Sequence, residues 1–89
     1  MILRRVTGYS MVPSLGPGQI ILARKSRKLR VGDVVVFRHR GLEKIKRLHA
    51  VNDGRIHVRG DNKNLSTDSR HFGSLPIEHV VARVIWPKV

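Results

Sequence analysis

The chain has 89 residues and no cysteine, and its 18 lysine and arginine residues against 6 aspartate and glutamate residues give a formal net charge of +12. This length predicts a single domain, residues 1–89, with a modest core, and the lack of cysteine excludes disulfides, thiolate metal sites and a cysteine nucleophile. No apolar run approaches the roughly 20 residues of a membrane-spanning helix, so we expect a soluble, cytoplasmic protein.

Short strands dominate the pattern along the chain. Apolar or alternating runs predict strands at residues 2–6, 19–24, 34–39, 42–51, 55–59 and 80–86. The continuous apolar run at residues 34–37 predicts a strand buried on both faces, and Asp53-Gly54 predicts a hairpin. Residues 60–73 form one polar loop, long for so small a domain and therefore a candidate for function, and residues 76–79 favour one helical turn. The predicted fold class is all-β: a small curled antiparallel sheet or partial barrel with at most one or two short helical turns.

Ser10 lies where the chain leaves regular pairing. Gly8 precedes it by two residues and permits a positive φ, and Pro13 follows by three and withholds a hydrogen-bond donor. A hydroxyl on such a bend, with free amides nearby, is a candidate nucleophile beside an oxyanion hole. The alternative is an ordinary turn-forming serine.

The basic stretch after the second predicted strand contains Arg24, Lys25, Arg27, Lys28 and Arg30. Such a density of positive charge favours an anionic membrane surface, an acidic protein partner or nucleic acid. The chain has only one Trp, one Tyr and two Phe to stack on bases, which argues against nucleic-acid binding. The alternative is a solvated basic loop between strands.

Lys44 and Lys46 are candidates for the base that a serine nucleophile needs. Burial disfavours the charged ammonium and lowers a lysine pKa, which makes the amine a usable general base. The two residues are two apart on one predicted strand and share a face, so periodicity does not choose between them. The alternative is that both are solvated strand lysines.

The polar loop supplies further candidates. Asp68 and Arg70 are placed to form an ion pair that stiffens the loop, and Ser66 or Ser69 offers a hydroxyl to orient a neutral lysine. Acidic and amide side chains also suggest a metal site, but the loop lacks the closing bidentate Glu of a calcium-binding loop. We therefore expect no metal and no cofactor.

Five segments together resemble the signal peptidase I family, which shares a Ser/Lys catalytic core with the LexA-type self-cleaving repressors. They are Gly-x-Ser-Met-x-Pro-x-Leu (residues 8–15), Gly-Asp-Val-Val-x-Phe (32–37), Lys-Arg-Leu (46–48), Gly-Asp-Asn-x-x-x-Ser-x-Asp-Ser-Arg-x-x-Gly (60–73) and Val-x-Arg-Val-x-x-Pro (81–87). The resemblance covers nearly the whole chain.

The resemblance implies a role for each matching position. Ser10 corresponds to the nucleophile, whose amide meets the oxyanion, and Lys46 corresponds to the general base. Ser66 corresponds to the lysine-orienting hydroxyl. The family's structural box corresponds to Gly60, Asp61, Asn62, Asp68 and Arg70, the last two as an ion pair. Gly8 stands where many members have a hydroxyl that assists the oxyanion.

Within this group, the short chain without a membrane anchor is most similar to the small proteases that mature nickel-type superoxide dismutase by removing a leader from its precursor. The implied function is a serine endopeptidase acting on an extended segment of a precursor protein. The alternatives are an anchorless signal peptidase that cleaves signal peptides and, from another class, a small basic β-barrel that binds nucleic acid.

Overall fold

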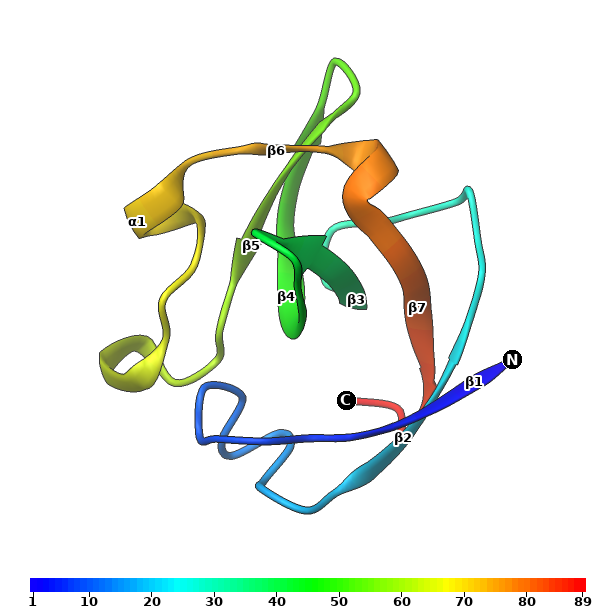
Figure 1. Cartoon of the computed structure of the whole chain (residues 1–89), viewed down its shortest axis with the longest axis vertical. Helices are drawn as coiled ribbons and strands as arrows, with labels where there is room; N and C mark the ends of the chain where they lie inside the picture. The colour runs from blue at the N-terminus through cyan, green and yellow to red at the C-terminus, as the bar shows by residue number, and fades with distance from the viewer.

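Seven strands form one antiparallel sheet in the order β1-β2-β7-β3-β4-β5-β6 in the computed structural model, which describes all of residues 1–89 (Figure 1). The strands are β1 (Ile2–Arg5), β2 (Ile20–Arg24), β3 (Val34–His39), β4 (Leu42–Asn52), β5 (Arg55–Arg59), β6 (Leu75–Pro76) and β7 (Val80–Trp86). The sheet curls without closing and ends at β1 and β6. This confirms the predicted all-β fold class.

The predicted strand boundaries agree closely with the structure. Strands β3, β5 and β7 begin and end at the predicted residues, and β4 extends one residue further, to Asn52. The turn between β4 and β5 places Asp53 at φ 49° and Gly54 at φ 74°, which are the left-handed conformations that a tight two-residue hairpin requires. The Asp-Gly pair therefore sets this hairpin locally.

Strand β3 is buried on both faces because each face packs into a different apolar cluster. Val34 and Val36 belong to a cluster with Val6, Met11, Leu15, Ile21, Ala23 and Ala82. Val35 and Phe37 belong to a second cluster with Leu48, Ile56, Val58 and Leu75. Side chains alternate across a strand, so a continuous apolar run is what a strand between two cores requires.

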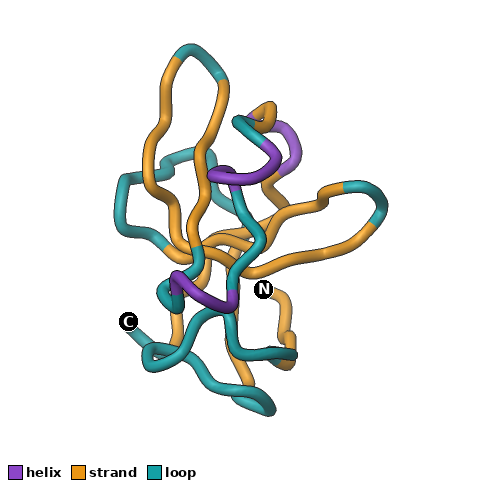
Figure 2. Tube along the Cα trace, turned by 90° about the vertical axis from the view of Figure 1, so that its left-hand side faces the viewer, coloured by secondary structure: helices purple, strands orange, loops and turns teal.

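The polar segment 60–73 is more ordered than its sequence predicted. It contains the 3₁₀ turn η1 (Lys63–Leu65) and the short helix α1 (Ser69–Phe72), and with η2 (Ile77–His79) the chain has three short helical segments, one more than expected. Asp68 accepts a hydrogen bond from the Arg70 amide at 3.1 Å and so caps α1. Elements of three or four residues are too short to show a helical period. Figure 2 views the molecule from the side on which η1 and α1 lie.

Candidate active site

The turn that presents Ser10 is fixed to the first apolar cluster. Met11, the next residue, and Leu15 are each 1% exposed and pack in this cluster, while Ser10 itself stays half-exposed. The Leu15 amide donates to the Met11 carbonyl at 3.0 Å, which closes the turn. Gly8 has φ +75°, a conformation that other residues rarely adopt, and it redirects the chain from β1 into the turn. The hydroxyl of Ser10 is therefore displayed from a fixed backbone.

Asn62 connects the Ser10 turn to the segment after β5. Its amide donates to the Ser10 carbonyl at 2.9 Å, and its side-chain amide donates to the Tyr9 carbonyl at 3.2 Å. The amides of Ser10 and Met11, in contrast, have no backbone acceptor within the chain. Free N–H groups beside a nucleophile are the donors that stabilise an oxyanion.

Arg47 and Asp61 tie β4 to the same turn. The Asp61 carboxylate accepts hydrogen bonds from Arg47 Nε at 2.9 Å and Nη2 at 2.8 Å, and it also accepts the Ser14 hydroxyl. The Arg47 hydrogen bonds hold the pKa of Asp61 below its usual range. Arg47 and Ser14 were not among the predicted site residues, although the Lys-Arg-Leu and Gly-x-Ser-Met-x-Pro-x-Leu motifs contain them. Since Arg47 directly follows Lys46, this bridge fixes β4 against the Ser10 turn.

Lys46 and Ser10 line one groove of about 160 Å³, whose walls come from β1, the Ser10 turn and the start of β4. The Lys46 side chain is buried, with 7% of the residue exposed. Burial lowers the pKa of Lys46, and repulsion from Lys44 adds to this, while the attraction of Asp68 opposes it. No hydrogen bond joins Lys46 to Ser10 in this structure, and the shared groove is what brings them together.

Lys44 also lines this groove, but its ammonium has other partners. Its Nζ lies 3.2 Å from Nδ1 of His39 and 5.3 Å from the ring centroid of Phe72. Burial and the charge of Lys44 lower the pKa of His39, which favours the neutral ring, the form whose unprotonated nitrogen accepts a hydrogen bond from an ammonium. The structure thus separates two lysines that strand periodicity left equivalent: both line the Ser10 groove, but only Lys46 is buried, and the Lys44 ammonium contacts His39 and Phe72.

Asp68 is the centre of the polar loop. It is fully buried and accepts hydrogen bonds from Ser66 Oγ at 2.7 Å, from the Gly60 amide at 2.8 Å and from Arg70 Nη2 at 2.7 Å. Burial alone would raise the pKa of the Asp68 carboxyl, but these hydrogen bonds outweigh it and hold the pKa well below its usual range. The Asp68–Arg70 ion pair therefore stiffens the loop.

The two candidate lysine-orienting serines have different partners. Ser66 Oγ donates to Asp68 and accepts from the Gly60 amide at 3.1 Å. Ser69 Oγ accepts from the Val58 amide at 2.8 Å and so fastens α1 to β5. In this structure neither hydroxyl is hydrogen-bonded to Lys46. Ser66 is hydrogen-bonded to Asp68, and the negative charge of Asp68 raises the pKa of Lys46 against the effect of burial.

Gly60 lies where the loop and the Ser10 turn meet. A Cβ at this position would lie 2.2 Å from Ser66 Oγ and 2.5 Å from the Ser10 carbonyl oxygen. Both distances are far inside van der Waals contact, so this close approach of two backbones requires glycine. The glycine of the Gly-Asp-Asn segment therefore has a steric role in placing Ser10.

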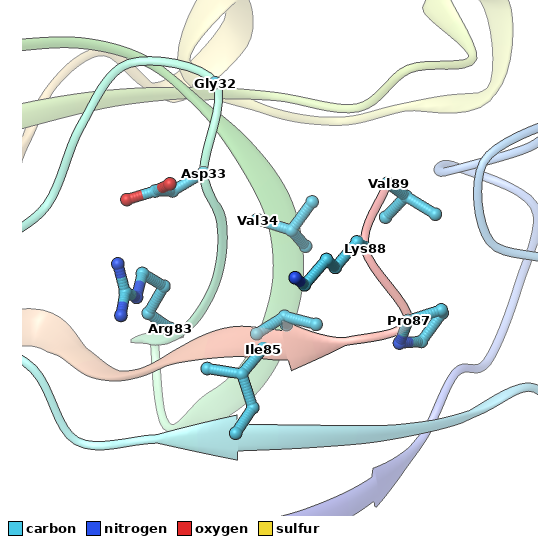
Figure 3. A pocket seen from close by; sticks show the side chains of 9 residues that line it. Gly32, Asp33, Val34, Arg83, Ile85, Pro87, Lys88 and Val89 are labelled. Atoms are coloured by element: carbon cyan, nitrogen blue, oxygen red, sulfur yellow. The ribbon is translucent and has the colours of Figure 1, made fainter.

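Larger cavities lie elsewhere on the molecule. One of about 650 Å³ lies between the loop after β2 and the β7 region, and one of about 350 Å³ lies beside the C-terminus (Figure 3). In Figure 3 the Asp33 and Arg83 side chains point to the same side of the second cavity, and Lys88 extends across it. Neither cavity is lined by a serine beside a buried lysine. The chemistry of the side chains, rather than the volume, therefore selects the Ser10 groove.

The fold is therefore an open antiparallel sheet in which Ser10, on a turn, and the buried Lys46 line one groove. The sequence matches the family described as Peptidase S24-like over residues 1–84. The chain therefore belongs to this family, which supports the predicted relation to LexA-type peptidases. A comparison with curated proteins gave no match. The helices here are all too short and too polar to cross a bilayer.

Proposed function

We propose that this protein is a serine endopeptidase in which Ser10 is the nucleophile and Lys46 is the general base. The observation that carries the proposal is that Ser10 and Lys46 line one groove and that burial lowers the pKa of Lys46. A lysine is a proton acceptor only when neutral, and desolvation favours the neutral form. Family membership supports the same class of activity.

The proposed reaction proceeds through an acyl-enzyme. Neutral Lys46 accepts the Ser10 hydroxyl proton as Oγ attacks the scissile carbonyl, and the tetrahedral oxyanion accepts hydrogen bonds from the free Ser10 amide. The Lys46 ammonium then donates its proton to the departing amine, which leaves an ester on Ser10. Water, deprotonated by Lys46, hydrolyses the ester and restores the serine.

We propose that the substrate binds as an extended strand at unpaired strand edges beside the groove. β1 pairs only with β2. The start of β4 pairs with β3 from Leu42 onward, but its pairing with β5 begins only at Arg47. Each of these segments therefore has one edge without a strand partner, and both contribute residues to the groove. Free edges of this kind bind extended peptides through main-chain hydrogen bonds.

The finer proposal is that the enzyme removes an N-terminal leader from a precursor protein, with a nickel-type superoxide dismutase precursor as the preferred substrate. Its support is the resemblance of the five ordered motifs to the signal peptidase I family, within which the sequence favoured the small maturation proteases. Signal-peptide cleavage is the alternative within the same chemistry.

We also propose that the loop between β2 and β3 recruits an acidic segment of the precursor or an anionic membrane surface. Arg24, the last residue of β2, and the loop residues Lys25, Arg27, Lys28 and Arg30 are all exposed. Clustered exposed charges attract anionic partners and raise their association rate.

The experiment that tests the proposed function is incubation of the purified protein with a nickel-type superoxide dismutase precursor, followed by mass spectrometry of the products. Ser10→Ala and Lys46→Met are expected to be inactive, whereas Lys44→Met, the matched control on the same strand face, is expected to retain cleavage. Cleavage of a signal-peptide substrate but not of the precursor would retain the Ser10/Lys46 dyad and reject the superoxide dismutase precursor as the substrate. Equal behaviour of the wild type and Ser10→Ala would reject the peptidase proposal.

A further inference from the structure

An ion pair crosses the groove that holds Ser10. Arg4 on β1 donates from Nε to one Glu43 carboxylate oxygen and from Nη2 to the other at 3.4 Å. These two residues come from strands that are not neighbours, because β2, β7 and β3 lie between β1 and β4 in the sheet. Both residues line the groove, so the pair bridges its two walls.

The charges around this groove are unbalanced. Its lining includes the cationic side chains of Arg4, Arg5, Lys44 and Lys46, and Glu43 is the one acidic residue among them. Even with Lys46 neutral, positive charge exceeds negative charge. Such a groove attracts anionic groups and repels cationic ones.

Among the cationic side chains that line the groove, Arg4 is the one that already binds a carboxylate, that of Glu43, and it remains accessible to solvent. Its side chain is 41% exposed, whereas that of Glu43 is 25% exposed. The planar guanidinium binds carboxylates through paired N–H donors. An incoming carboxylate can replace Glu43 and conserve those hydrogen bonds, so little desolvation opposes the exchange.

Building on the proposed peptidase function, we propose that Arg4 is a specificity-determining residue that binds an acidic side chain of the peptide in the Ser10 groove. Glu43 holds the guanidinium across the groove in the free enzyme and is displaced by the substrate carboxylate. The preferred substrate therefore carries Asp or Glu in the segment that contacts β1 and the start of β4.

The test uses the Ser10→Ala protein, which leaves bound peptides intact, and fluorescein-labelled alanine-rich peptides that carry a single Glu or Gln at successive positions. Binding is measured by fluorescence anisotropy. At one or two positions the Glu peptide is expected to bind about three- to fivefold more tightly than its Gln counterpart, as for an exposed ion pair. Adding Arg4→Gln is expected to abolish the difference, and adding Glu43→Gln is expected to increase it by removing the competing carboxylate.

Arg4→Gln and Glu43→Gln are expected to change the Glu preference in opposite directions if Arg4 recognises the peptide. If the ion pair were purely structural, either substitution would change the affinity for the Glu and Gln peptides equally. Arg59→Gln is the control for loss of one positive charge, because Arg59 is exposed and does not line the groove. A Glu preference that survives Arg4→Gln, or absence of binding by every Glu peptide, would overturn the inference.

The wild-type protein and the Arg4→Gln variant with Ser10 intact are then incubated with the same peptides, and the products are identified by mass spectrometry. Cleavage without an Arg4-dependent preference would reject the inference and retain the peptidase function. Arg4-dependent binding without any cleavage would retain the binding role of Arg4 and reject the peptidase function.

Discussion

Replacing Gly60 by alanine tests whether the contact between the polar loop and the Ser10 turn positions the nucleophile. The new methyl group would lie 2.2 Å from Ser66 Oγ and 2.5 Å from the Ser10 carbonyl oxygen, about 1 Å short of ordinary van der Waals contact in each direction. The loop and the turn must therefore separate by about that distance. Overpacking of this kind costs about 1–3 kcal/mol of folding free energy.

The same displacement is also expected to lower peptidase activity strongly. A shift of about 1 Å in a catalytic group can reduce the rate by about a hundredfold. Urea unfolding followed by circular dichroism measures the stability change, and kcat/KM for cleavage of the precursor measures the activity change.

Gly16→Ala is the matched control, because a Cβ at Gly16 meets nothing within 4 Å and its φ is not positive. We expect this variant to keep full activity and to be slightly more stable, by roughly 0.4–1 kcal/mol, because alanine restricts the unfolded chain. A Gly60→Ala protein as stable and active as the Gly16→Ala protein would refute the steric role of Gly60.

Four further predictions concern charge. Activity is expected to rise with pH through a Lys46 pKa below the ordinary value of 10.5, and Lys44→Met is expected to move this rise to higher pH, because it removes a repulsion that lowers the pKa; an unchanged pH–rate profile would contradict the assignment. Asp68→Ala is expected to cost about 2–4 kcal/mol in urea unfolding, because it leaves Arg70 and buried donors without an acceptor, out of a total of about 4–13 kcal/mol for a domain of this size. The pKa values of Asp61 and Asp68 are lowered in the folded protein, so their ionised carboxylates stabilise the fold, and this stabilisation is fully present above pH ~4. An acid titration of folding stability should show it being lost as the pH falls through those lowered pKa values. Neutralising the basic residues of the loop between β2 and β3 is expected to slow precursor cleavage at low salt but not at high salt, and equal rates at low salt would reject its recruiting role.

The strands and several turns of this protein follow from local sequence. Alternation and apolar runs predicted β3, β5 and β7 to the residue, because side-chain direction in a strand depends on position along that strand alone. The hairpin after Asn52 was equally predictable, since the φ values of Asp53 and Gly54 belong to the turn itself. The resemblance of the ordered motifs further predicted the peptidase class, with Ser10 as the nucleophile and Lys46 as the general base.

Tertiary structure decided which groups meet. Periodicity placed Lys44 and Lys46 on one face, and only the packing of β4 shows that Lys46 is buried in the wall of the Ser10 groove while Lys44 contacts His39 and Phe72. Helical residues between 60 and 73 escaped prediction because each helical segment is only three or four residues long.

Contacts between distant segments were the least accessible to sequence. The bonds from Asn62 to the Ser10 turn, the Arg47–Asp61 bridge and the Arg4–Glu43 pair all join segments that the chain itself separates. The sequence shows that a buried or crowded charged residue needs an oppositely charged or hydrogen-bonding partner. It does not show which of the several suitable residues along the chain is that partner. The curl of the sheet, set by the two apolar clusters on either side of β3, selects among them.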